Sequence, residues 1–305
     1  MVGDLKLLNS GKVREIYELN DDLLLIVTSD RISAFDVIMD QIIPEKGKVL
    51  NNISAYWFEK TGSIIPNACV GVLNEDLATK YNIDTNEDLF QRSTVMKRAE
   101  PLKVECIVRG YITGSGWKEY QAKGSVSGIE LEAGLQNSSK LPTALYTPST
   151  KADIGEHDEA ISYEQTIDII GEQHANTLKL RSIALYEYAA QLALQKGIII
   201  ADTKFEFGLI DGEPVLIDEV LTPDSSRFKI SKENETGLNV GYYDKQIVRD
   251  ALTNEKKNSH QLPMELSPNV VRLVCNGYRK ICEKVCNYRF PMVGVVMGSE
   301  SDWKT

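Results

Sequence analysis

Residues 198–227 read IIIADTKFEFGLIDGEPVLIDEVLTPDSSR, and this stretch sets the expectation for the rest of the fold. It opens with a run of isoleucines and then alternates, which places Asp202, Lys204 and Glu206 on one face of a strand and two phenylalanines on the other. A strand that begins with apolar residues alone is typical of the centre of a sheet. We therefore expect the rest of the chain to pack around this strand or to complete the charged face that it carries.

A second strand is predicted at 215–220, joined to the first by a tight turn at the Asp-Gly pair 211–212. Its last residues include Asp218 and Glu219, so the hairpin brings four carboxylates near Lys204. Carboxylates on neighbouring strands suit a Mg²⁺ ion that also holds nucleotide phosphates, and a lysine balances the phosphate charge. The alternative is the solvated face of an edge strand. The apolar start of the first strand and the Pro-Asp-Ser-Ser-Arg turn after the second favour a metal and phosphate site.

The composition is that of a cytoplasmic globular protein. The chain has 305 residues, 42% of them hydrophobic and 26% charged, enough for one large or two modest domains. The net charge of −10, from 34 basic and 44 acidic residues, argues against broad binding to nucleic acid or anionic membranes. The sequence has neither an apolar signal segment nor a stretch near the ~20 apolar residues of a membrane span. Five cysteines without a C-x-x-C pair argue against a disulfide framework.

The elements before residue 100 are expected to be short strands and one helix. The first predicted strand starts with Gly11, Lys12 and Arg14, a glycine and two cations that could lie over phosphates, although the chain has no Walker motif. A polar, turn-rich region and the Glu-Pro step at 100–101 indicate a subdomain boundary. The predicted elements are strands at 11–17, 23–27 and 93–96, an ordered loop at 28–36 and a helix at 51–60.

After residue 100 the chain alternates between strands, loops and longer helices. Arg109 ends a strand that runs into a glycine-rich turn, where it either faces a ligand or forms a structural salt bridge. Residues 141–159 are loop-like and dense in polar side chains, and such loops often carry binding groups. A helix is predicted over 161–195, with Ser162 as its N-cap and a break at Gly171. Further helices are predicted at 242–252 and 269–288.

Seven blocks occur in order along the sequence: GKVREIYE, TSDRISAFDVIM, IPEKGKVLNNIS, VRGYITGSGWKEY, TPSTKADIGEHDE, ADTKFEFG and DEVLTPDSSRF. Together they resemble the SAICAR synthetases of purine biosynthesis. The resemblance runs from about Gly11 to Arg249. It implies an α+β fold of two lobes, with an antiparallel N-terminal sheet over a larger α/β lobe and an ATP cleft between them, as in kinases and ATP-grasp enzymes.

The resemblance implies a reaction in which ATP drives amide formation between the carboxylate of the ribotide CAIR and the amine of L-aspartate. The products are SAICAR, ADP and phosphate, and the CAIR carboxylate first becomes an acyl phosphate. Such chemistry needs positioning and charge neutralisation more than covalent help from the protein. Two alternatives stay open: another Mg-ATP-dependent kinase or ATP-grasp-like ligase, and a silent nucleotide-binding scaffold. The presence of Lys204, Glu206 and Asp218 argues against the scaffold.

The resemblance also implies roles for single residues. Glu206 and Asp218 would hold Mg²⁺, and Lys204 would lie between the phosphates and the CAIR carboxylate. The remaining implied positions are Lys12 and Arg14 in a phosphate-covering loop, Val95 to Lys97 beside adenine, Lys151 at the nucleotide, Arg109, Ser115 and Arg227 at CAIR, and Asp202 and Asp158 near the polar groups of CAIR.

The register of the hairpin tests the implied metal ligands. A two-residue turn at 211–212 pairs Glu206 with Ile217 and would put Glu219 on the Glu206 face. A three-residue loop, or a bulge further along the hairpin, pairs Glu206 with Asp218 instead. We predict this second register, with Glu219 turned away.

We divide the chain into four parts by these arguments. They are an ATP-covering lobe at 1–100, a catalytic and substrate lobe at 101–254, a helical segment at 255–291 and a last stretch at 292–305. The last stretch begins MVGVVMGSESDW and resembles the first strand and phosphate-binding turn of an AIR carboxylase/mutase domain. This resemblance implies a truncated fusion or a vestige of such a domain, with a possible fusion to, or association with, an AIR carboxylase/mutase, and no second activity is carried over to the stretch itself.

Overall fold

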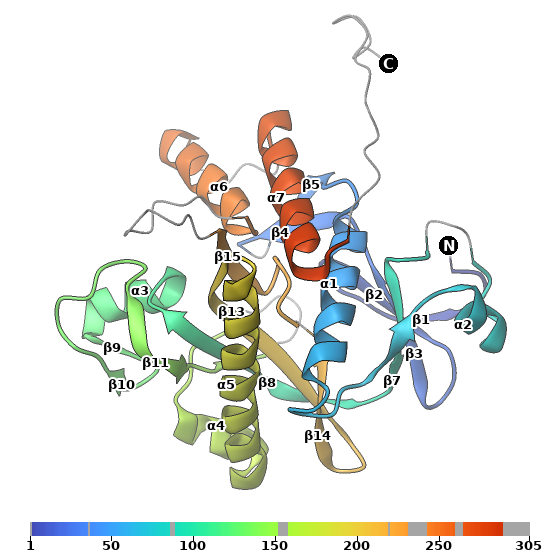
Figure 1. The fold of residues 1–305 in the computed structure, drawn as a ribbon, viewed down its shortest axis with the longest axis horizontal. Coiled ribbons are helices and arrows are strands. Elements are labelled where there is room, and N and C mark those ends of the chain that lie inside the picture. Colours follow the sequence, from blue (N-terminus) through green and yellow to red (C-terminus); the bar gives the residue numbers. More distant parts are fainter. Residues whose placement is uncertain are drawn as a thin grey trace, which may run out of the picture.

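The described part of the chain is built on two large sheets whose strands pair antiparallel. The computed structural model describes residues 2–35, 37–85, 89–151, 158–218, 220–230, 243–259 and 265–288. A six-stranded sheet lies behind the long central helix in Figure 1, and a five-stranded sheet lies to its right. These antiparallel sheets, together with the helices of the chain, confirm the predicted α+β class.

The bounds of the elements follow from the backbone. The five-stranded sheet has the order β1 (Lys6–Ser10), β2 (Arg14–Glu18), β3 (Leu23–Thr28), β7 (Ser93–Lys97) and β6 (Cys69–Val72). The six-stranded sheet has the order β11 (Lys140–Tyr146), β8 (Glu100–Tyr111), β13 (Ile198–Ile210) and β14 (Glu213–Asp218), with β12 (Ser149–Thr150) beside β8 and β15 (Ser226–Ile230) beside β13. Two small sheets pair β4 (Arg31–Ala34) with β5 (Val37–Ile42), and β9 (Ser125–Val126) with β10 (Ile129–Glu130).

The helices are α1 (Lys46–Thr61), α2 (Glu75–Lys80), α3 (Gly114–Lys123), α4 (Tyr163–Ile170), α5 (Glu172–Gln195), α6 (Gln246–Ser259) and α7 (Pro268–Cys286). Within the described ranges, none is long and apolar enough to cross a membrane.

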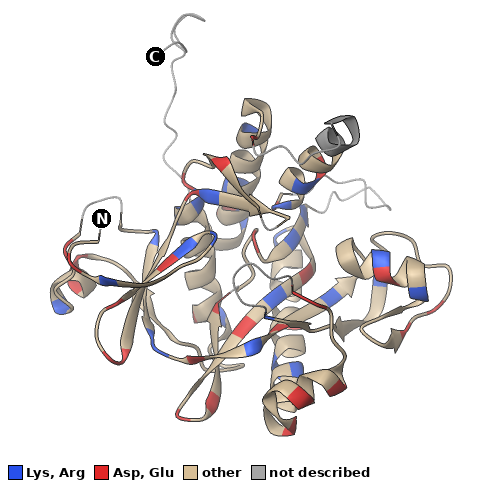
Figure 2. Ribbon diagram, turned by 180° about the vertical axis from the view of Figure 1, so that it is seen from behind, with Lys and Arg blue, Asp and Glu red and all other residues tan. Residues whose placement is uncertain are grey.

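The strand β13 lies inside the six-stranded sheet, as its apolar start predicted. It pairs with β8 on one side, and with β15 and then β14 on the other. Asp202 lies opposite Arg109, and Glu206 lies opposite Glu105. Because directly opposed residues share a face, the charged face of β13 continues onto β8. Seen from behind in Figure 2, basic and acidic positions lie next to one another along strands in the middle of the molecule.

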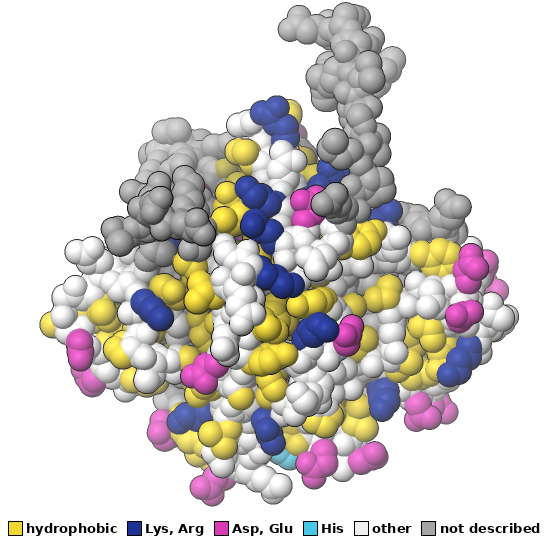
Figure 3. Space-filling view, viewed as in Figure 1, with side chains coloured by type: hydrophobic (Ala, Val, Ile, Leu, Met, Phe, Trp, Pro, Cys, Tyr) yellow, Lys and Arg dark blue, Asp and Glu magenta, His cyan; other side chains and the backbone are white. Residues whose placement is uncertain are grey.

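The other face of this sheet is covered by α5. Phe205 and Phe207 are fully buried and belong to one hydrophobic core with Leu178 and Leu185 of α5. The outer surface over α5 faces the viewer in Figure 3 and mixes hydrophobic and charged side chains. The sheet therefore has one face for packing and one face that carries charges.

The start and the break of the long helical region are as predicted. The Ser162 hydroxyl accepts a hydrogen bond from the backbone N–H of Gln165, and the Gln165 side chain accepts one from the N–H of Ser162. This capping box begins α4. Gly171, with φ of 81°, separates α4 from α5. An L-residue with a side chain rarely adopts this backbone conformation, so glycine suits the break.

The hydrophobic cores group the elements differently from the four-part division. The five-stranded sheet has a core of its own that includes Leu25 and Val95. A larger core joins Trp57 of α1, Phe205 of β13 and Ile281 of α7. Helices from the first and the third predicted parts thus pack together with the second. The division at residues 100, 254 and 291 stays a prediction.

Two segments predicted as loops contain strands. Within 28–36, the strand β4 forms a small hairpin with β5, and its Ile32 and Ala34 are buried. Within 141–159, β11 and β12 pair with β8. The loop predictions were wrong because a strand near the surface needs only every second residue to be apolar, so a polar average does not exclude it. The helix predicted at 51–60 begins earlier, at Lys46.

Candidate active site

The hairpin pairs Glu206 with Asp218, as predicted. The turn at 211–212 has two residues, both with positive φ (54° and 81°), which matches a type I′ turn. The simple register of that turn holds as far as Phe207, and a bulge then shifts it by one so that Glu206 pairs with Asp218. The bulge alternative is confirmed and the three-residue loop is not formed. Glu219 lies outside the described residues, so its orientation stays a prediction.

Asp202 is held between two arginines at one end of the charged face. Arg109 Nη1 donates to Asp202 Oδ2 over 2.9 Å, and Arg227 Nη1 donates to the same oxygen. Arg109 also donates to Thr147 Oγ1 and to Ser115 Oγ, each over 3.0 Å. Burial lowers the pKa of Arg109, although the Asp202 charge opposes this. The salt-bridge interpretation of Arg109 is confirmed, and its position beside Ser115 and Arg227 keeps the ligand interpretation open.

Gly114 allows Arg227 to approach the start of α3. Its φ is 57°, and a Cβ atom built there would lie 2.2 Å from Arg227 Nη2. A side chain at this position would displace the guanidinium group, so the close approach requires glycine. The first turn of α3, two guanidinium groups and the Ser115 hydroxyl therefore meet at one place. Such a set of donors suits a phosphate or a carboxylate.

Glu206 is held between two lysines at the other end of the charged face. Lys151 Nζ donates to Glu206 Oε2, while Lys204 Nζ donates to Glu105 Oε1 and lies 3.8 Å from Glu206 Oε1. Burial opposes the charge of Glu206, but Lys204 and Lys151 outweigh it and lower the pKa of Glu206. Burial raises the pKa of Glu105, against the effect of Lys204. Lys204 is thus shared by two carboxylates.

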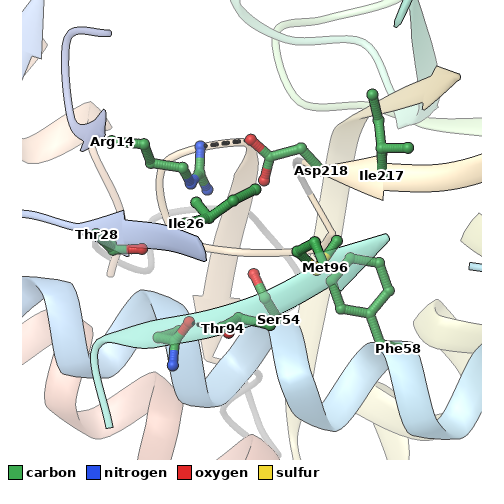
Figure 4. Close-up of a pocket in the computed structure, with 10 residues that line it drawn as sticks. Arg14, Ile26, Thr28, Ser54, Phe58, Thr94, Met96, Ile217 and Asp218 are labelled. Carbon is green, nitrogen blue, oxygen red and sulfur yellow. Dashed lines mark hydrogen bonds and ion pairs between the residues drawn. The ribbon is translucent and has the colours of Figure 1, made fainter. Parts of the chain in front are cut away.

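An open pocket adjoins this end of the charged face. Figure 4 shows the pocket, with the ion pair between Arg14 Nη1 and Asp218 Oδ2 at 3.0 Å on its border. Apolar walls with a few polar groups and a charged edge suit a flat base joined to phosphates. The other lining residues are Ile26, Thr28, Asn51, Ser54, Phe58, Thr94, Met96 and Ile217.

The predicted segment 95–97 contributes to this pocket through Met96. The side chains of Thr94 and Met96 line the pocket, whereas Val95 is fully buried in the core of the five-stranded sheet. Alternate residues of a strand face opposite ways, so the side chain of Val95 cannot contact a ligand in the pocket. Lys97 ends β7 and is exposed.

Two further predicted residues, Lys12 and Asp158, lie near the charged face at exposed positions. Lys12 is exposed in the turn before β2, next to Arg14. Asp158 is exposed, and its charge contributes to the raised pKa of Glu105. Asp158 therefore lies on the side of the charged face that holds Lys204.

Sequence reasoning missed Glu105 and the contribution of α1. Glu105 and Arg109 are four residues apart on one strand, so they share a face, and this spacing was a usable signal. The pocket residues Asn51 and Phe58 carried no such signal, because an amphipathic helix was expected to serve the core. Asn51 accepts a hydrogen bond from Thr94 Oγ1 over 2.6 Å, which joins α1 to β7 beside the pocket.

The chain is similar in sequence to proteins of one family. The family model described as SAICAR synthetase matches residues 7–265. The phosphoribosylaminoimidazole-succinocarboxamide synthase of Thermodesulfovibrio yellowstonii is 50% identical over 276 residues, which cover 90% of this chain and 94% of that protein. The enzyme of the same name from Haemophilus influenzae is 47% identical over 277 residues, with 90% and 94% covered.

Solved structures agree with the sequence relatives. The SAICAR synthase of Saccharomyces cerevisiae, complexed with SAICAR, superposes with a TM-score of 0.80 at 37% identity and covers 95% of this chain and 97% of its own. The SAICAR synthetase of Pyrococcus horikoshii OT3 has a TM-score of 0.65 at 19% identity, with 91% and 99% covered, and supports the fold alone. The predicted SAICAR synthetase-like fold is confirmed. The chain belongs to the SAICAR synthetase family, the ligases of purine biosynthesis that use ATP to join CAIR to L-aspartate.

Proposed function

We propose that the two ends of the charged face divide the ligase reaction between them, with Mg²⁺ and the nucleotide phosphates at Glu206 and with CAIR at Asp202. The observation that carries this proposal is the place of Lys204. It lies between Asp202 and Glu206 on one face of β13, and its ammonium group already contacts two carboxylates. A cation in this place can stand between the carboxylate of CAIR and the phosphate that reacts with it.

Glu206 and Asp218 are the proposed ligands of Mg²⁺. They pair directly across the hairpin, and both supply the hard carboxylate oxygens that Mg²⁺ prefers. Among the described residues no group of three His, Cys, Asp or Glu side chains could hold a metal ion. Two carboxylates are enough, because Mg²⁺ usually takes its other ligands from water and substrate phosphates. When bound, the ion would neutralise phosphate charge at this end of the face.

The nucleotide is proposed to lie in the pocket, with its phosphates at the Arg14 edge. Ile26, Met96 and Phe58 offer apolar contact to adenine. Arg14 and the neighbouring Lys12 would cover the phosphates, and Lys151 would reach them from the other side. Burial opposes the charge of Lys151, but Glu206 and Asp218 outweigh it and raise its pKa, so Lys151 stays cationic.

CAIR is proposed to bind at the other end, where Arg109, Ser115 and Arg227 converge. The Arg227 side chain is 17% exposed and also donates from Nε to Gln246 Oε1 over 3.3 Å. A planar guanidinium suits a phosphate or carboxylate. Asp202 would fix both arginines and, with Asp158, would lie near the polar groups of CAIR.

The reaction follows from these positions. An oxygen of the CAIR carboxylate attacks the γ-phosphorus of ATP, the bond to the bridging oxygen breaks, and ADP leaves. The amine nitrogen of L-aspartate then attacks the carbon of the acyl phosphate, phosphate leaves, and the nitrogen loses a proton. Lys204 lowers the repulsion between the two anions in the first step, which is where positioning and charge stabilisation contribute most.

The proposal also covers the localisation of the enzyme and a partner enzyme. We place it in the cytoplasm, in keeping with the composition. We also propose fusion to an AIR carboxylase/mutase, or association with one, on the resemblance of residues 292–305, which lie outside the described residues.

Release of ADP with each substrate omitted in turn tests the reaction. ADP should form only when CAIR, L-aspartate and Mg-ATP are all present, apart from any single turnover of the acyl phosphate. Steady release of ADP without aspartate would indicate a kinase instead. Binding of Mn²⁺ in the presence of ATP, followed by electron paramagnetic resonance, tests the metal site. Glu206→Gln and Asp218→Asn should each weaken binding, and Glu213→Gln, at the exposed start of β14, is the matched control.

A further inference from the structure

A buried ion pair and a tyrosine hydroxyl hold the turn that leads into β15. Lys46 Nζ lies 2.8 Å from Asp224 Oδ2, with side chains 0% and 5% exposed. The hydroxyl of the fully buried Tyr278 donates to Asp224 Oδ1 over 2.5 Å. Burial opposes the charge of Asp224, but Lys46 outweighs it and lowers the pKa of Asp224. Both carboxylate oxygens are therefore occupied, one by α1 and one by α7.

The turn that contains Asp224 is tied to β13 at two successive residues. The backbone N–H of Lys204 donates to the carbonyl of Ser225 over 3.0 Å. The hydroxyl groups of Thr203 and Ser226 are 2.7 Å apart. The next residue is Arg227, which holds Asp202. Asp224 thus lies three residues before the guanidinium that we propose binds CAIR, in a turn that is bonded to β13.

The helix α7 also contacts the residues just before α1. Arg279 forms an ion pair with Glu45, and Cys275 Sγ lies 3.5 Å from the carbonyl oxygen of Pro44. The two helices lie side by side in Figure 1. The family model matches residues 7–265 and so ends before α7. The helix is thus an element outside the matched region that reaches the turn of the active site.

We propose that Tyr278 is a positioning residue for CAIR: through Asp224 it holds the turn at 222–226 and so places Arg227 against the substrate. The inference rests on the proposed role of Arg227 at CAIR. Arg14 and Lys151, which are proposed to bind the nucleotide phosphates, lie outside this turn, at the start of β2 and directly after β12. Loss of the hydroxyl should therefore affect CAIR and leave ATP nearly unchanged.

The test is Tyr278→Phe, which removes one hydroxyl and keeps the packed ring. The expected result is a rise in KM for CAIR of about tenfold, the scale of one hydrogen bond to a charged group, while KM for ATP stays within about twofold. Tyr288→Phe is the matched control, because its hydroxyl donates to the side chain of Gln91 instead. This control should leave both KM values unchanged.

Three results would overturn the inference. They are an unchanged KM for CAIR, an equal rise for CAIR and ATP, and a loss of activity explained by a lower fraction of folded enzyme. Thermal unfolding of each variant, with kinetics measured well below the lower Tm, separates the last case. Arg227→Ala, measured in parallel, tests the proposed role of Arg227 at CAIR separately from the positioning role of Tyr278. If Arg227→Ala raises KM for CAIR and Tyr278→Phe does not, only the positioning role fails; if neither does, the proposed CAIR site fails.

Discussion

The two ends of the charged face use one arrangement with different cations. Asp202 lies between two arginines and Glu206 between two lysines, and the carboxylate side chains are 5% and 12% exposed. A guanidinium group is planar and presents its donors in a fixed fork, whereas an ammonium group is a point charge on a flexible stem. The Asp202 end is therefore suited to holding the shape of a ligand. The Glu206 end is suited to charges that are redistributed during the reaction.

The largest effect is expected from Lys204→Met, which removes the cation between the two ends and keeps an apolar stem. Turnover should fall by about 10² or more, the scale for the loss of one charge-stabilising group. Steady-state release of ADP measures it. Lys123→Met, at an exposed position of α3, is the control. Turnover within a few-fold of the wild type would contradict the role of Lys204.

The next largest effect should show that the two ends of the charged face bind different ligands. Arg227→Ala is expected to weaken the binding of CAIR by about tenfold or more and to change ATP binding little, because a charge-assisted hydrogen bond is lost at one end alone. Lys151→Ala should do the reverse. Calorimetric titration of each ligand into each variant measures both. Equal losses for both ligands in Arg227→Ala would mean that Arg227 is only structural.

A smaller effect concerns stability and pH at the Glu206 end. Despite burial, Lys204 and Lys151 lower the pKa of Glu206 from its ordinary value of 4.5. The ionised group therefore stabilises the folded state above pH 4.5, and this contribution is lost as the pH falls from 4.5 through the lowered pKa. Glu206→Gln should lower the free energy of unfolding by about 1 to 3 kcal/mol at pH 7. Urea unfolding of both proteins should show this difference shrinking below pH 4.5, and a difference independent of pH would contradict the assignment.

The smallest effect is expected from removal of residues 292–305. The contacts that build and support both ends of the charged face come from residues 14–278, so turnover and Tm should stay as in the full chain. ADP release and calorimetry measure the two quantities. A clear fall in either would show that the segment supports the ligase.

Much of the site could be predicted because strands have a short and regular repeat. Alternation alone put Asp202, Lys204 and Glu206 on one face, and the structure places the partners of all three on that face. The β4–β5 hairpin could not be predicted in this way, because the polar Ser33 is buried between Ile32 and Ala34, so burial in β4 does not alternate. The pairing of Glu206 with Asp218 needed the family resemblance, since the two-residue turn by itself favours Ile217.

The sequence by itself determined the central strand with its two unlike faces and the capped, divided helix over 163–195, because each depends on neighbours in the chain. It also determined membership of the family, because that depends on long matching motifs. Tertiary structure alone decided the bulge beside Glu206, the pocket formed by α1 with β3 and β7, and the burial of Asp224 between Lys46 and Tyr278. These features join residues far apart in the chain. Each depends on how elements pack against one another, and local sequence carries little information about that packing.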